Sequence, residues 1–157
     1  MPATVYFSSM RADLRRNLFA KLDRMIEKLA MREVLDESHI VALKLHFGEA
    51  GSSAFIRPVF IRHLAQAALQ TGARVFATDT CTLYGGSRQH AVGHLETAFH
   101  HGFTYATLGV PVMIADGLRS MAGVHVPERR PSAIITGTPT ACARWPACTY
   151  PSPAIER

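Results

Sequence analysis

The sequence predicts an α/β domain with an open, mainly parallel, Rossmann-like sheet and flanking helices. Two observations support this prediction. Short apolar segments alternate along the chain with segments of helical periodicity, and Gly or Pro stands at several of the junctions. Strands that alternate with helices need crossover connections, which are right-handed, so the sheet is expected to be mainly parallel.

The first predicted elements are a short strand over residues 3–7 and a helix that Asp13 caps. Apolar residues recur along this helix at helical spacing and predict one buried stripe: Leu14, Leu18, Leu22, Met25, Ile26 and Leu29. Basic and acidic residues are interleaved on the rest of the helix, which is typical of a solvated face with i,i+4 pairs.

The central predicted elements are two strands joined by a helix. Residues 40–47 are nearly all apolar, as expected for a strand covered on both faces. Pro58 suits the first turn of a helix that runs to about Gln70 and ends at Gly72. A third strand is predicted over residues 74–78.

The last predicted elements are a helix that Ser87 caps and Gly102 ends, and a strand over residues 112–115. The α/β domain is expected to span residues 1–126. Residues 127–157 hold six of the nine prolines, four arginines and no lysine, which predicts an irregular tail.

Composition and charge limit the partners. The formal net charge is +5, but the basic residues are dispersed, whereas nucleic-acid binding needs a concentrated stripe. No apolar run is long enough to cross a membrane, and the first ten residues lack the pattern of a signal peptide. The odd number of cysteines, three, indicates a reducing compartment, so we expect a cytoplasmic protein.

Polar residues follow the predicted strands where each strand ends. Lys44 and His46 are two residues apart and therefore share a face of their strand, and Asp79 and Asp116 end two others. Ligands of open α/β sheets bind beyond the carboxyl ends of the strands. We therefore predict Lys44, His46 and Asp79 as catalytic residues. The alternative for Lys44 is an ion pair with an acidic residue that only closes the sheet edge.

Two glycine-containing loops precede the second and third helices. Their backbone N–H groups and hydroxyls favour a carboxylate or a phosphate, and Arg57 and Arg88 can add bidentate contacts. Neither loop has the P-loop or the dinucleotide-binding pattern, so ordinary strand-to-helix turns are the alternative. The predicted ligand-binding residues are Gly48, Glu49, Arg57, Thr80, Tyr84, Gly86, Ser87, Arg88, His94 and Asp116.

A metal-dependent enzyme is a further hypothesis. His90 and His94 have i,i+4 spacing, and His46 or Asp79 could add a ligand. The alternative is a partly solvated helix face. Cys81 could be a nucleophile if a base lowered its pKa, but a neutral, semi-buried thiol is the expected state.

Seven motifs occur in order along residues 3–120: Lys44–Glu49 (KLHFGE), Ile56–Pro58 (IRP), Thr78–Thr80 (TDT), Leu83–Arg88 (LYGGSR), His94–Ala98 (HLETA), Gly102–Tyr105 (GFTY) and Ile114–Leu118 (IADGL). Together they resemble the uncharacterised iron–sulphur-centre proteins, the family called domain of unknown function 362. The resemblance implies a prokaryotic protein and an α/β core. It also implies, for full-length members, a ferredoxin-like module with [4Fe–4S] clusters.

The chain departs from this pattern after about residue 125, where the second half of the family domain and the ferredoxin cysteines are missing. Three scattered cysteines cannot bind a [4Fe–4S] cluster, which needs four thiolates, so we expect no cofactor in this chain. The leading hypothesis is the N-terminal, truncated or incomplete part of an iron–sulphur-linked, oxidoreductase-like protein that binds a small anionic molecule. The alternative is a non-catalytic or truncated binding module that needs a partner chain or a second copy.

Overall fold

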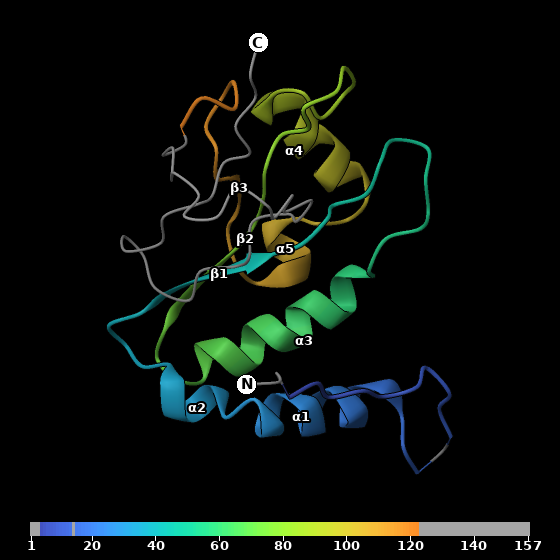
Figure 1. Cartoon of the computed structure of the whole chain (residues 1–157), viewed down its shortest axis with the longest axis vertical. Helices are drawn as coiled ribbons and strands as arrows, with labels where there is room; N and C mark the ends of the chain where they lie inside the picture. Colours follow the sequence, from blue (N-terminus) through green and yellow to red (C-terminus); the bar gives the residue numbers. More distant parts are fainter. Residues whose placement is uncertain (1–3, 14, 123–157) are drawn as a thin grey trace, which may run out of the picture.

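The computed structural model describes residues 4–13 and 15–122 (Figure 1). They form one open sheet of three parallel strands, in the order β1 (Ile40–Lys44), β2 (Arg74–Asp79) and β3 (Val112–Ile114). The predicted α/β fold with a mainly parallel sheet is therefore confirmed. The tail predicted over residues 127–157 lies outside the described residues.

The strand register decides which residues reach the sheet edge together. Val41 pairs with Val75, and Lys44 pairs with Thr78, one residue before Asp79. On the other side of β2, Asp79 pairs with Ile114. The carboxyl ends of all three strands therefore lie at one edge of the sheet.

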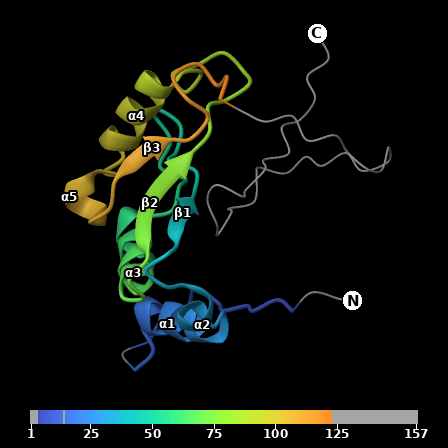
Figure 2. The same cartoon turned by 90° about the vertical axis from the view of Figure 1, so that its left-hand side faces the viewer.

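The helices that follow the strands lie on one side of the sheet (Figure 2): α3 (Pro58–Leu69), α4 (Ala91–His100) and α5 (Tyr105–Leu108). The strand order advances in one direction, so right-handed crossovers place both connections on the same face. The sequence predicts residues 40–47 as a strand covered on both faces. The strand spans Ile40–Lys44, and Val41 and Ala42, which point to opposite faces, are both buried. Among the described helices none covers the second face, where Met113 is 43% exposed.

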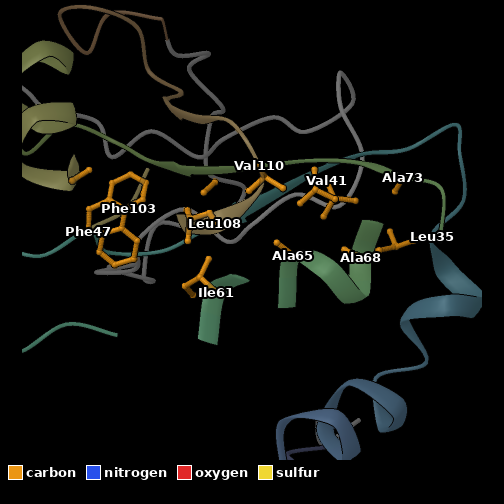
Figure 3. Close-up of a cluster of buried hydrophobic side chains, with 13 residues drawn as sticks. Leu35, Val41, Phe47, Ile61, Ala65, Ala68, Ala73, Phe103, Leu108 and Val110 are labelled. Carbon is orange, nitrogen blue, oxygen red and sulfur yellow. The ribbon is translucent and has the colours of Figure 1, made fainter. Parts of the chain in front are cut away.

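The hydrophobic core fills the space between the sheet and the helices (Figure 3). Val41 and Val75 face Ala65 and Ala68 of α3, whose small side chains allow the helix to approach the strands closely. Larger side chains fill the end nearer α4: Phe47, Ile61, Phe103 and Leu108. Burying a side chain of this size contributes about 1.5–3 kcal/mol to stability.

The N-terminal helices lie outside this core. α1 (Leu18–Lys28) and α2 (Met31–Val34) pack along the outer side of α3 (Figures 1 and 2). The prediction of a buried stripe on this helix is wrong: none of the α1 residues is buried. Leu18, Leu22 and Met25 are only half-buried because α1 contacts a helix rather than the sheet. Within the described ranges, no helix is long and apolar enough to cross a membrane.

Some predicted boundaries are confirmed and others are wrong. Pro58 starts α3 as predicted, and Gly102 follows α4 with a φ of 83°, a conformation that favours glycine. Residues 4–7 form no strand, and Phe7 is 90% exposed. This segment runs beside α1, where Lys21 Nζ donates a hydrogen bond to the Ser9 carbonyl (2.9 Å).

Two predicted helix caps are also wrong. Asn17, not Asp13, caps α1 through the N–H of Ala20. The Asp13 carboxylate instead accepts hydrogen bonds from the N–H groups of the next two described residues, Arg15 and Arg16. Residues around Ser87 form turns, so α4 starts later and its cap is His90, whose Nδ1 accepts the Gly93 N–H (3.1 Å). A polar side chain therefore caps both α1 and α4, but the local turn decides which residue does so.

Candidate functional site

Six polar side chains meet at the carboxyl ends of β1 and β2. We call them the sheet-edge cluster: Lys44, Glu49, Asp79, Tyr84, Arg88 and His94. They come from both strand ends, from the two loops that follow, and from the first turns of α4. The parallel register joins residues that are distant in the sequence, as the strand-end argument predicted.

Asp79 is the central carboxylate of the cluster. Its Oδ1 accepts hydrogen bonds from Lys44 Nζ (3.0 Å) and from the Thr80 N–H (2.9 Å). Its Oδ2 lies 3.7 Å from Arg88 Nη1 and 3.3 Å from His94 Nε2, without hydrogen-bond alignment to His94. Burial raises the pKa of Asp79, but the His94 ring and the Lys44 ammonium outweigh it, so the pKa lies below its ordinary value. Asp79 is therefore an ionised, buried counter-charge.

Arg88 is the buried cation of the cluster, only 3% exposed. Its Nη2 donates to a carboxylate oxygen of Glu49 and to the Tyr84 hydroxyl (2.9 Å). The Tyr84 hydroxyl also donates to Glu49. These two hydrogen bonds, that of Arg88 first, lower the pKa of Glu49 to about 2. Glu49 and Tyr84 thus cover the guanidinium from the solvent side.

The charges inside the cluster are unevenly distributed. Lys44 and Arg88 carry two positive charges, while Asp79 is the one carboxylate nearly as buried as they are. The second carboxylate belongs to Glu49, whose side chain is 41% exposed. Asp116 is nearby, but it forms no ion pair with any described residue. Without Glu49, the buried part of the cluster would have a net positive charge.

Several buried polar atoms at this edge make no hydrogen bond within residues 4–13 and 15–122: Asp79 Oδ2, Arg88 Nε, His94 Nδ1, His94 Nε2 and Asp116 Oδ1. Buried polar groups in folded proteins are nearly always hydrogen-bonded. His94 is fully buried. Its ring and that of Phe47 pack in a T-shaped arrangement, with the ring centroids 5.8 Å apart. The edge of the sheet therefore holds buried donors and acceptors that have no partner among the described residues.

The other predicted residues lie around the cluster. His46 is exposed, and its Nδ1 accepts the N–H of Gly48 (2.9 Å), which stands at a φ of 93°. Gly86 and Ser87 are exposed in the loop before α4. Asp116 accepts the N–H of Cys81 (3.0 Å). These residues are brought to the same edge without joining the ion pairs.

Arg57 is the predicted ligand-binding residue that the fold separates from the others. It precedes α3 and lines a groove between α1 and α3. Ser120 was not predicted, but its hydroxyl contacts the Asp116 carboxylate. The Asp-Gly turn at residues 116–117, with a serine shortly after it, was the available signal.

Metal and cysteine chemistry find little support in the described part of the chain. No three His, Cys, Asp or Glu side chains there could hold a metal ion. His90, one of the residues considered, caps α4 through its ring. Burial, and then the nearby Asp116 charge, raise the pKa of Cys81 to about 11, so the thiol is protonated at neutral pH. Three cysteines in the whole chain do not fit a [4Fe–4S] cluster.

The fold and the site define the class: a parallel α/β domain with a buried, ion-paired cluster at the carboxyl edge of its sheet. The profile of a family described as "Domain of unknown function (DUF362)" matches residues 41–141. The chain belongs to this family. The matched stretch contains every residue of the sheet-edge cluster. No curated protein and no solved structure matches the chain.

The low pKa of Glu49 predicts a pH effect on stability. Its pKa falls from 4.5 to about 2 on folding, so its contribution is complete above pH 4.5 and is lost as the pH falls toward 2. We expect Glu49→Gln to reduce the loss of stability in this window. Urea unfolding of both proteins at several pH values measures the effect. If the free energy of unfolding falls equally with pH in both proteins, the contact with Arg88 does not stabilise the ionised carboxylate.

Proposed function

We propose that this domain binds a small anionic molecule at the carboxyl edge of the sheet, with the sheet-edge cluster as its binding site. The observation that carries the proposal is the charge arrangement around Arg88. Two buried cations share one buried carboxylate, and a partly exposed glutamate supplies the second. A carboxylate or phosphate of a ligand can replace Glu49 and bind Arg88 through parallel hydrogen bonds.

Each neighbouring group has a role in this proposal. Lys44 and Asp79 lie next to Arg88 in the site. In this proposal they transfer protons to or from the bound molecule. His46 is the solvent-exposed base or acid at the edge of the site. Because His46 Nδ1 accepts the Gly48 N–H, the neutral ring carries its proton on Nε2. Tyr84, Ser87 and the N–H groups of the glycine loops complete the anion-binding surface.

The resemblance stated above adds a redox context. In this proposal the chain is the α/β part of a cytoplasmic, ferredoxin-linked system, and the iron–sulphur clusters are held elsewhere. The ligand is then a small organic anion that exchanges electrons with such a cluster. This context rests on the resemblance, whereas anion binding rests on the geometry of the sheet-edge cluster.

Calorimetric titration of the full chain with inorganic phosphate and with malonate tests the proposal. Arg88→Gln should weaken binding at least tenfold, since hydrogen bonds to charged groups contribute about 1.5–3 kcal/mol. Arg62→Gln, an equal charge change at an exposed residue of α3, should leave binding unchanged. Equal losses in both variants would indicate non-specific attraction and contradict the proposal.

A second variant keeps the test decisive if Arg88→Gln fails to fold. Glu49→Gln removes the internal carboxylate but leaves the arginine in place. It should bind both anions several-fold more tightly than the wild type, because the ligand no longer displaces a charged partner. Weaker binding in this variant would mean that Glu49 helps to form the site rather than occupying it.

A second candidate function is association of two copies through the second face of the sheet. Ile40, Phe76 and Met113 line a shallow apolar hollow of about 350 Å³ on it, and the outer edges of β1 and β3 make no strand pair within the described residues. Such edges and apolar surfaces favour association. Sedimentation velocity should show a dimer that Met113→Glu dissociates. A monomeric wild type would exclude this function.

A further inference from the structure

A cavity lies in the groove between α1, α3 and the segment before α1, and no residue of the sheet-edge cluster lines it. Its volume is about 390 Å³, within the range of small-molecule sites. Its walls are mainly apolar: Leu18, Leu22, Met25, Phe60, Ile61 and Leu64. The two helices run side by side in both views (Figures 1 and 2). The cavity lies beside the amphipathic α1, none of whose residues is buried.

The polar residues of this groove have one sign of charge. Arg57 and Lys21 line it together with two serines, and no acidic residue does. The exposed Arg57 side chain makes no hydrogen bond or ion pair with any residue that the structure describes. Lys21 Nζ donates to the backbone carbonyls of Ser9 and Arg11, which leaves its charge without a carboxylate partner among the same residues. Of the acidic residues near Lys21 along the chain, Asp13 pairs with Arg16 (3.7 Å) and Asp23 contacts the His63 ring.

We propose that this groove binds an organic acid with an apolar body, such as a medium-chain fatty acid. Its carboxylate would bind the Arg57 guanidinium, with the Lys21 charge beside it, and its chain would lie between α1 and α3. A guanidinium binds a carboxylate through two parallel hydrogen bonds, and an apolar wall favours alkyl over polar groups. This site is independent of the one proposed at the sheet edge.

Calorimetry of the full chain with octanoate, hexanoate and octanol, below their aggregation concentrations, tests this site. Octanoate should bind about fifteenfold more tightly than hexanoate, because it has two more CH₂ groups and each one buried strengthens binding about fourfold. Arg57→Gln should weaken octanoate about tenfold and leave octanol unchanged. Arg62→Gln places the same charge change on α3 outside the groove and should alter neither.

The outcomes separate the groove from other sources of binding. Loss of octanoate binding in Arg57→Gln, with Arg62→Gln unaffected, supports the proposal. The proposal fails if Arg57→Gln binds octanoate as the wild type does, or if both arginine variants lose affinity equally. It also fails if the wild type binds hexanoate and octanoate equally, because the chain would then not be buried. Since Arg57 is exposed, its variant is expected to fold.

Discussion

Replacing Asp79 by Asn is expected to lower the free energy of unfolding by about 3–5 kcal/mol, the usual cost of removing one partner from a buried ion pair. The amide keeps the size of the side chain and can still accept from Thr80. It removes the negative charge that Lys44 and Arg88 share. The partly exposed Glu49, which pairs with Arg88, would then be the one carboxylate left in the sheet-edge cluster.

Urea unfolding followed by circular dichroism measures this loss. Glu96→Gln on the exposed face of α4 is the matched control and should stay within about 0.5 kcal/mol of the wild type. Adding Lys44→Met to Asp79→Asn removes one uncompensated cation and should recover part of the loss. A loss below about 1 kcal/mol in Asp79→Asn would show that water screens the cluster more than its burial indicates.

Replacing Phe47 by Ala is also expected to lower the free energy of unfolding by about 3–5 kcal/mol. Phe47 is fully buried and contacts both Phe103 (ring centroids 5.2 Å apart) and His94. Its removal leaves a cavity between the core and the sheet-edge cluster. The His94 ring would lose its packing contact with Phe47, so the affinity for phosphate should also fall.

Thermal and urea unfolding, together with phosphate titration, measure both effects. Phe7→Ala is the matched control, because that ring is exposed and its loss should change stability by less than about 0.5 kcal/mol. Phe47→Leu retains most of the apolar volume and should cost less than Phe47→Ala. If Phe47→Ala lowers stability while phosphate binding is unchanged, the core does not position the His94 ring.

The fold class was predictable because its signals are local. The apolar run that contains β1 and the periodicity of α3 each need only a short stretch of sequence, and Pro58 and Gly102 act through their own backbone preferences. Helix caps were less predictable. Asp13 and Ser87 are good caps in isolation, but turns after each of them delay the start of the helix to the residue that follows Asn17 or His90.

The candidate site was predictable in part for a similar reason. Parallel strands must end at the same edge, so the closeness of Lys44 and Asp79 follows from topology. The contact of Arg88 with Glu49 joins residues 39 positions apart in two loops, and no rule of spacing predicts it. The same limit applies to Arg57, which follows the first glycine-containing loop but lines the groove between α1 and α3.

The sequence by itself determined the parallel α/β class and the set of polar residues at the strand ends, because alternation, Pro and Gly act within a few residues. Only the tertiary structure decided which charges are paired, which are buried and which polar atoms have no partner. It also left α1 half-exposed over an apolar groove. These properties depend on how loops and helices pack across the chain, and packing joins residues that no local pattern connects.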